Sequence, residues 1–354
     1  MRITNKVMNN NMLRNLNSNL RRLDAVNQQL ASGKKVQFAS DDPVGAGSIM
    51  RLRSSLHENE QYLRNVDQGI SWLDATDSVL KDTTTILHRA RELTVYGASD
   101  TLDGSARKAL ADEIDQLFEN VFQLSNSTHA GRQLFGGQET RSTPFEVMDQ
   151  DAVITYLDAE RPGLDWDVLA DDPEAFAAAL ADLATGDEPL FLYGFGDSFV
   201  QYTGGFDNSG ALDPDNRFNT AALTREIGVN ADVQLNLLGN DVFGEVFTVL
   251  AQASHYLKQG DSGNLATDVL GKFDETLDSL LGEYSDIGAK TNRLELAKER
   301  LADLKVNLTA LFSESHDVDV AEAIMHLKAE ENTYRTALSV GARIIQPSLV
   351  DFLR

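Results

Sequence analysis

The stretch of the chain that looks most like a chemical site is FASDDPVGAG, residues 38–47, in which Asp41 and Asp42 precede a proline and two glycines. Paired carboxylates can hold a divalent cation, and a glycine-rich loop at a helix start can bind a phosphate. The glycines, however, match neither the GxGxxG nor the GK[ST] pattern. Asp42 before Pro43 is instead typical of a helix start. The carboxylate accepts hydrogen bonds from the first free N–H groups, and proline has no N–H to leave unsatisfied. We interpret Asp42 and Pro43 as a helix cap.

No other combination of residues predicts catalysis. GFGDSFV (194–200) lacks the G-x-S-x-G spacing of a nucleophile elbow, and DPDNRFN (213–219) lacks the glycine and distal glutamate of a calcium loop. The chain has no cysteine, which excludes disulfides and thiolate metal sites. We therefore expect a protein that is not an enzyme and that needs no cofactor. A metal-dependent enzyme in the acidic middle of the chain is the alternative, because aspartates are suitable ligands, although no spacing there supports a site.

Both ends of the chain carry the heptad pattern of helices that pack along a seam. The final segment has Glu331 and Gly341 in register with its apolar positions, and Gly33 is a plausible end for the first helix. Such a stripe needs a partner, from the other end of the chain or from another subunit. The assembly residues that we predict are Leu13, Leu16, Leu20, Leu23, Leu30, Ile324, Leu327, Tyr334, Leu338 and Ile345.

Two long helices are expected between these ends. One runs from Pro43 to Tyr96, about 80 Å at 1.5 Å per residue, which is more than a single globular core requires. The other carries a seam from Ile287 to Leu311 with Lys290 as its polar position. The predicted fold is mainly α, a long antiparallel coiled-coil-like bundle built from both chain ends, with a central mixed or β-rich insert.

The middle of the chain lacks the heptad pattern of the ends and carries a strongly acidic charge. TPFEVM (143–148) and AVITYL (152–157) are predicted strands, and 171–183 is a predicted short helix. TREIGVN and VQLNLLG are predicted to form a hairpin joined by Ala231 and Asp232. Residues 142–247 hold 3 Arg, no Lys and 21 Asp plus Glu, a net charge of −18. This pattern indicates a solvated domain that keeps the chain soluble while its ends assemble.

Composition also excludes several classes of protein. A net charge of −24 argues against nucleic-acid binding, and no apolar run approaches the ~18 residues of a membrane span. The first 20 residues lack the apolar core and cleavage site of a secretory signal. We expect a protein that stays in the cytoplasm or is exported by a pathway that recognises a different signal.

Several long motifs at the two ends resemble the bacterial flagellin superfamily. They cover roughly residues 1–141 and 224–354, and together they are highly specific. The motifs are LASGKKVQFASDDPVGAGSIMRLR (30–53), NVDQGISWLDATDSVL (65–80), RARELTVYGASDT (89–101) and AEAIMHLKAEENTYRTALSVGARIIQPSLVDFLR (321–354). Within the superfamily, GKKV…SDDPV, GRQLFGGQETRSTPF and the ending IIQPSLVDFL are more similar to the hook-associated protein 3 branch, the hook–filament junction proteins.

The resemblance implies a structural part of the extracellular flagellum, exported through the type III channel without a cleaved signal. It implies a ring of copies between hook-associated protein 1 and the first flagellins, and an export chaperone at the C-terminal helices. We expect a terminal assembly domain (1–39 with 313–354), a helical bundle domain with a hairpin (40–144 with 224–312) and the acidic insert (145–223). A minor filament flagellin and a cytoplasmic coiled-coil adaptor are the remaining alternatives.

Overall fold

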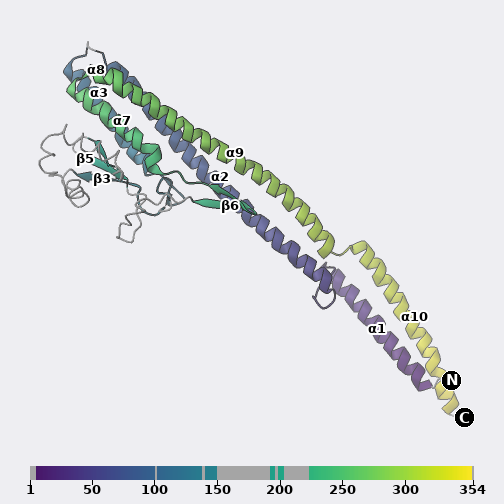
Figure 1. Ribbon diagram of the computed structural model, residues 1–354. Helices are drawn as coiled ribbons and strands as arrows, with labels where there is room; N and C mark the ends of the chain where they lie inside the picture. The colour runs from purple at the N-terminus through teal and green to yellow at the C-terminus, as the bar shows by residue number, and fades with distance from the viewer. Residues whose placement is uncertain are drawn as a thin grey trace. The chain divides into compact units, whose positions relative to one another are not determined.

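A computed structural model describes residues 5–99, 102–137, 140–149, 192–195, 198–202 and 223–352 (Figure 1). The helices are α1 (Asn5–Ser32), α2 (Pro43–Gly97), α3 (Gly104–Ser125), α7 (Gly239–Gln259), α8 (Ser262–Asn264), the π-helix η1 (Leu265–Val269), α9 (Leu270–His316) and α10 (Val320–Phe352). The strands are β1 (Thr128–His129), β2 (Arg132–Gln133), β3 (Phe145–Asp149), β4 (Leu192–Phe195), β5 (Ser198–Tyr202), β6 (Thr224–Gly228) and β7 (Ala231–Gln234). The predicted fold class, mainly helical with a small central β region, is confirmed. Within the described residues, no helix is long and apolar enough to cross a membrane.

The chain divides into two compact units, each with its own contacts. Unit 1 consists of residues 1–61 and 300–354, and unit 2 consists of residues 62–299. Unit 1 therefore contains the helices α1 and α10, the start of α2 and the end of α9. Unit 2 contains the rest of α2 and α9, the other helices and the described strands.

Helix α2 confirms the long helix predicted from Pro43, and it ends one residue later than expected, at Gly97. In unit 2 its heptad positions are covered: Val66, Leu73, Leu80 and Leu87 are all at most 1% exposed. Gly69 allows a close approach of α9, because a Cβ at this position would lie 3.0 Å from Cδ1 of Leu294. The predicted seam of α2 is thus the core face of unit 2.

The centre of unit 2 is a cluster of phenylalanines that joins α3, α7, the segment after β2, and β3. Their rings meet at centroid distances of 5.0 Å between Phe118 and Phe247 and 5.2 Å between Phe145 and Phe247. Aromatic pairs at such distances add to the stabilisation from burial alone. The members, all at most 2% exposed, are Phe118, Phe135, Phe145, Phe243 and Phe247.

The central sheet has the order β3-β5-β4 with antiparallel pairing, and Phe145 of β3 and Tyr202 of β5 lie against Gly239 at the start of α7. Gly239 is required there, since a Cβ would lie 2.8 Å from the Phe145 ring and 2.9 Å from the carbonyl oxygen of Phe135. The Tyr202 hydroxyl donates to that same carbonyl at 3.2 Å, and burial raises the pKa of Tyr202. The base of the central region is therefore fixed to the helical bundle.

The β6–β7 hairpin is present, but its turn differs from the predicted one. Val229 and Asn230 form the turn, whereas Ala231 and Asp232 lie in β7, where they pair with Gly228 and Glu226. Asn230 has a positive φ of 56°, a conformation that asparagine tolerates better than most residues. The predicted strand 152–157 and helix 171–183 lie outside the described residues, as does most of the predicted insert domain 145–223.

Asn126 fixes the first residue of β3 through both ends of its amide. Its Nδ2 donates to the Phe145 carbonyl and its Oδ1 accepts from the Phe145 N–H, each at 3.0 Å. Replacing this asparagine by the isosteric aspartate removes the donor, because a carboxylate only accepts hydrogen bonds.

We predict that Asn126→Asp lowers the free energy of unfolding by about 1–3 kcal/mol, the cost of a buried acceptor without a partner. Urea unfolding followed by circular dichroism measures the change. Asn307→Asp, at an exposed asparagine of α9, is the matched control and should have little effect. Equal midpoints for the two variants would contradict the role given to Asn126.

Candidate assembly interface

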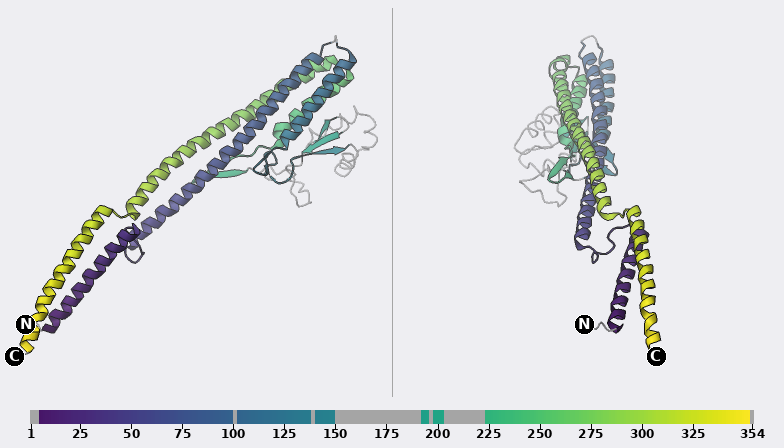
Figure 2. Two further views of the ribbon diagram at one scale, coloured as in Figure 1. Left: turned by 180° about the vertical axis from the view of Figure 1, so that it is seen from behind. Right: turned by 90° about the vertical axis from the view of Figure 1, so that its right-hand side faces the viewer.

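Helices α1 and α10 of unit 1 lie side by side in the views of Figures 1 and 2. Their facing residues repeat at alternating spacings of four and three, which is the heptad pattern. All of them are buried or half-buried. On α1 they are Met12, Leu16, Asn19, Leu23, Val26 and Leu30, and on α10 they are Ala323, Leu327, Glu330, Tyr334, Ala337 and Gly341. We call this set the inner stripe.

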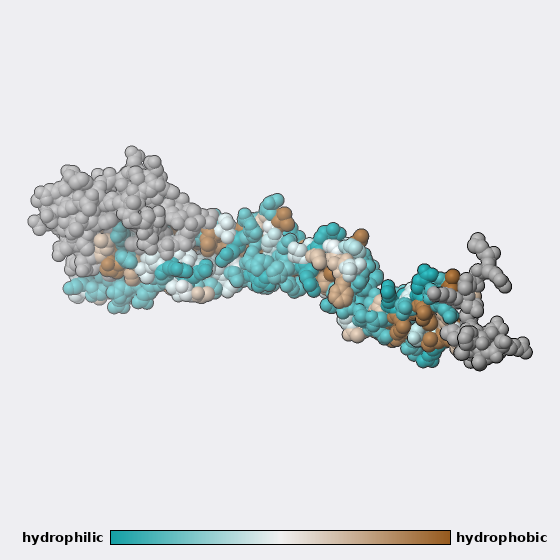
Figure 3. Space-filling view, turned by 90° about the horizontal axis from the view of Figure 1, so that it is seen from below, coloured by the Kyte–Doolittle hydropathy of each residue, from teal (hydrophilic) through white to brown (hydrophobic). Residues whose placement is uncertain are grey.

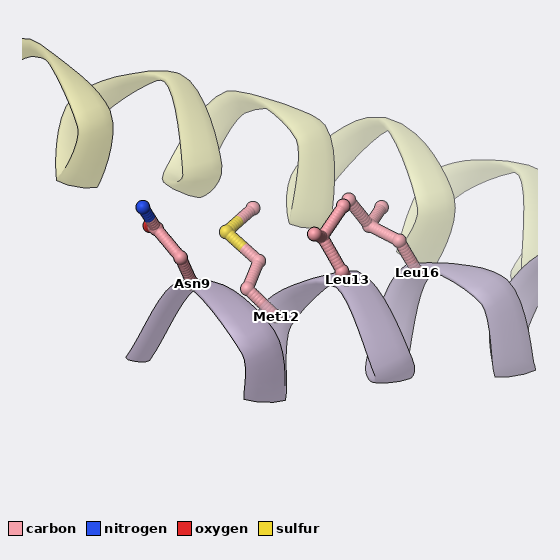
Figure 4. Close-up of a pocket in the computed structure, with 4 residues that line it drawn as sticks. All are labelled: Asn9, Met12, Leu13 and Leu16. Carbon is pink, nitrogen blue, oxygen red and sulfur yellow. The ribbon is translucent and has the colours of Figure 1, made fainter. Parts of the chain in front are cut away.

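The closest approach of the two helices is at Gly341, which is buried against α1. A Cβ on Gly341 would collide with the terminal methyl group of Met12 and would lie 2.8 Å from its sulfur. A larger residue would therefore force the methionine side chain to move. Next to this contact lies a partly open pocket of about 150 Å³ lined by Asn9, Met12, Leu13 and Leu16, all residues of α1. Figure 4 shows these four side chains on α1 directed toward α10.

A polar contact interrupts the apolar inner stripe near its middle. The Nε of Arg22 lies 2.9 Å from Oε1 of Glu330, and Nη2 of Arg22 donates to the buried Asn19 at 2.5 Å. Arg22 and Glu330 are 52% and 23% exposed. The ion pair is partly shielded from water, and it joins α1 to α10.

The segments after α1 and α9 are joined by a two-residue antiparallel contact. The N–H of Lys35 donates to the carbonyl of His316 at 2.7 Å, and the N–H of Val318 donates to the carbonyl of Gly33 at 3.0 Å. Gly33 has a φ of +70°, so the predicted glycine end of the first helix is confirmed. We call this contact the backbone clasp.

Asp317 stabilises the clasp from within. Its carboxylate accepts from the Ser313 hydroxyl at 2.6 Å and lies 2.7 Å from Nδ1 of His316. These contacts favour the charged form, so the Ser313 hydrogen bond and then the histidine hold the pKa of Asp317 below its ordinary value.

Two aspartates start the helices on either side of the clasp. Oδ1 of Asp42 accepts from the N–H groups of Val44 at 3.1 Å and Gly45 at 3.0 Å. Oδ1 of Asp319 accepts in the same way at the start of α10. A Cβ on Gly45 would collide with the Asp42 carboxylate, so this glycine makes room for a helix cap. Among the described residues, no group of three or more His, Asp or Glu could hold a metal ion.

The predicted assembly residues fall on two different faces of the terminal helices. Leu16, Leu23, Leu30, Leu327 and Tyr334 belong to the half-buried inner stripe. The side chain of Ile345, in α10, lies outside the described residues. The other four lie beside the inner stripe and are strongly exposed: Leu13 59%, Leu20 42%, Ile324 46% and Leu338 45%. We call these four the outer stripe.

More apolar side chains are exposed around the outer stripe. Figure 3 shows brown, hydrophobic residues breaking the hydrophilic surface at the end that holds α1 and α10. The exposed neighbours on these two helices are Val7, Met8, Val320, Met325 and Val340. Large apolar patches on a protein surface indicate a site that another protein covers.

Sequence reasoning did not single out Met12, Asn19, Arg22 or Glu330. Each is ordinary by composition, and only the pairing of α1 with α10 brings them together. The sequence did contain a sign of the polar position: Asn19 lies three residues after Leu16 and four before Leu23, a spacing that places it in the seam itself.

Comparison with known proteins identifies the family. The model of the bacterial flagellin N-terminal helical region matches residues 3–140, and that of the C-terminal helical region matches residues 270–353. The two matches together cover more than half of the chain. The chain therefore belongs to the bacterial flagellin family. As a member of this family it is a structural protein of the extracellular flagellum and not an enzyme.

Individual relatives include both flagellins and hook-associated proteins. A flagellin of Clostridium tyrobutyricum is 22% identical over 97% of this chain and 99% of its own length. Flagellar hook-associated protein 3 of Escherichia coli is 27% identical over 54% of this chain and 63% of its own length.

Solved structures share the fold at low sequence identity. A putative flagellar hook-associated protein from Vibrio parahaemolyticus has a TM-score of 0.54 at 15% identity, covering 78% of this chain and all of that one. FlgL of Bacillus cereus has a TM-score of 0.50 at 19% identity, covering 74% of this chain and 99% of that one. The flagellin-like fold that the sequence predicted is confirmed.

The two stripes predict different effects of leucine-to-glutamine substitutions on the isolated chain: destabilisation in the inner stripe and no change in the outer stripe. Leu16→Gln with Leu23→Gln places amides in the half-buried inner stripe, which we expect to cost about 1–2 kcal/mol per site. Leu13→Gln with Leu20→Gln changes only exposed positions, and glutamine has nearly the helix propensity of leucine.

Limited trypsin digestion at Arg14, Arg21 and Arg22 of α1 measures the difference. Cleavage should be at least about fivefold faster in the inner double variant, because cleavage follows the population of the opened helix. It should be unchanged in the outer one. Equal acceleration in both variants would contradict the assignment of the two faces.

Proposed function

We propose that this chain links the hook to the filament as a junction protein, by packing its terminal helices against those of neighbouring subunits. The observation that carries the proposal is the outer stripe, since its leucines remain exposed when α1 and α10 have paired. Burying such side chains is favourable, and association with another subunit would bury them.

The choice of the junction role rests on the two ends of the sequence. The pattern GKKV…SDDPV, within residues 30–53, and the ending IIQPSLVDFL are more similar to the hook-associated protein 3 branch. The relatives with that name, from Escherichia coli and Salmonella typhimurium, are 27% and 29% identical over 54% and 41% of this chain. The partners are accordingly hook-associated protein 1 on one side, flagellin on the other, and further copies of this chain in a ring.

Export and assembly follow from the same proposal. The chain leaves the cell through the flagellar type III channel without a cleaved signal, accompanied by a chaperone bound to the C-terminal helices. Residues 1–39 and 313–354 act as the assembly domain, 40–144 with 224–312 as the supporting bundle, and 145–223 as the acidic insert. Ordering of the terminal segments is completed when subunits stack, because isolated helices are marginal in water.

A minor filament flagellin is the second candidate function. The alignment with the Clostridium tyrobutyricum flagellin favours it, because that alignment spans nearly all of both chains. The terminal helices would serve a filament subunit equally well, so the two functions differ only in where the chain is placed.

Electron microscopy of a deletion strain distinguishes the two. The junction role predicts bare hooks, with flagellin released into the medium. A normal filament of altered composition would instead support the flagellin role.

Returning the Leu13→Gln, Leu20→Gln variant to that strain tests the outer stripe. We expect the variant to be exported yet to leave the hooks bare, because it lacks the apolar contact with its neighbours. The control is Val229→Gln, which also removes an exposed apolar side chain, at the turn of the β6–β7 hairpin, and should restore filaments. Full filaments with the double variant would contradict the role of the outer stripe.

A further inference from the structure

Three contacts along the terminal helix pair define one antiparallel register. Met12 meets Gly341 near one end, Arg22 meets Glu330 in the middle, and Gly33 meets Val318 at the clasp. The α1 number rises as the α10 number falls by nearly the same amount at each contact. The two helices are therefore aligned over more than 20 residues without a slip.

We propose that Arg22 and Glu330 are the pair that specifies this register, and through it the surface that the terminal helices present to a neighbouring subunit. The claim about the surface presented to a neighbouring subunit rests on the proposed function. The claim about the register concerns the isolated chain and does not depend on that function.

The spacing of the apolar residues in the inner stripe does not specify the register by itself. These residues repeat every three or four positions, so a slip by one helical turn again brings apolar side chains together. Between the described residues of α1 and α10, Arg22–Glu330 is the one ion pair that crosses from helix to helix. A polar pair in a seam selects one alignment, because the alternatives leave it without its partner.

The surroundings of Glu330 make this selection effective. Within the described residues, Oε2 of Glu330 is buried and has no hydrogen-bond partner, so the carboxylate depends on Arg22 through Oε1. Asn19, 9% exposed, holds the guanidinium from the other side. A slip would leave a poorly solvated carboxylate beside apolar residues, which is unfavourable even where the ion pair itself adds little stability.

Register matters because the outer stripe is built from both helices. Leu13 and Leu20 come from α1, whereas Ile324 and Leu338 come from α10. A one-turn slip moves the two halves by about 5.4 Å relative to each other. A helix pair in the slipped register would then present an outer stripe that no longer fits the corresponding surface of a second copy.

Disulfide trapping in the purified full-length chain tests the proposal, and the chain has no cysteine of its own to interfere. Met12→Cys with Gly341→Cys reports the observed register. Met12→Cys with Ala337→Cys reports a slip by one turn, because Cβ atoms must come within about 4.5 Å to form a disulfide. Each reporter pair is combined with Arg22→Glu, with Glu330→Arg, and with both changes together.

We expect the in-register crosslink to dominate in the parent. It should fall about two- to fivefold relative to the slipped crosslink in either single reversal, the effect of a partly exposed ion pair. The charge-swapped double variant should restore it. Glu331→Gln is the matched control, because Glu331 pairs with Lys328 of its own helix at 3.3 Å, and it should leave the ratio unchanged.

An unchanged ratio in the single reversals, or no recovery in the swapped variant, would overturn the proposal. So would a parent in which residues 12 and 341 cannot be crosslinked. None of these results depends on filament growth. Failure of the register pair is thus distinguishable from failure of the junction role, which the deletion strain tests.

Discussion

Each terminal helix carries more apolar surface than one partner helix can cover. In α1, leucines recur at both heptad positions and at the positions beside them, so they occupy two adjoining faces. Pairing with α10 covers one of these faces, the inner stripe, and leaves Leu13 and Leu20 more than 40% exposed. A monomer cannot satisfy both faces, and this constraint makes the ends of the chain suited to association with other subunits.

Unit 2 meets no such constraint. Its central phenylalanines are at most 2% exposed, and its sheet is fixed to α7 at Gly239, where no side chain would fit. Burial on that scale supports a core that is stable without a partner subunit. Within unit 1, the pairing of α1 with α10 instead relies on half-buried leucines, one partly exposed ion pair between the helices and two backbone hydrogen bonds at the clasp. The contrast supports the proposal that unit 1 takes part in assembly and that unit 2 provides structural support.

Much of the helical architecture could be predicted from the sequence, because capping and periodicity act locally. The start of α2 at Pro43 and the end of α1 before Gly33 follow from chemistry within a few residues. The burial of Leu73 and Leu80 follows from the heptad pattern. The division of the terminal leucines between an inner and an outer stripe could not be predicted in this way. Spacings of three and four place Leu13, Leu16 and Leu20 in one continuous band, and only the position of α10 decides which part of the band is covered.

The remaining differences have similar causes. The β6–β7 turn lies at Val229 and Asn230 because strand pairing sets the turn, and Val229 by itself is a poor turn residue. Arg22 and Glu330 are 308 positions apart in the sequence, so no local pattern could connect them. Long-range pairing is thus the part of the structure that local chemistry leaves open, and it is also the part on which the proposed assembly depends.

Hydrogen exchange of the purified monomer tests the central claim most directly. If the terminal helices reach full burial only between subunits, amides of α1 and α10 should exchange much faster than those of α2 between Val66 and Leu87, because half-buried helices open easily. Protection of α1 and α10 equal to that of the α2 core would contradict the account, since it would show that the ends are already complete in the single chain.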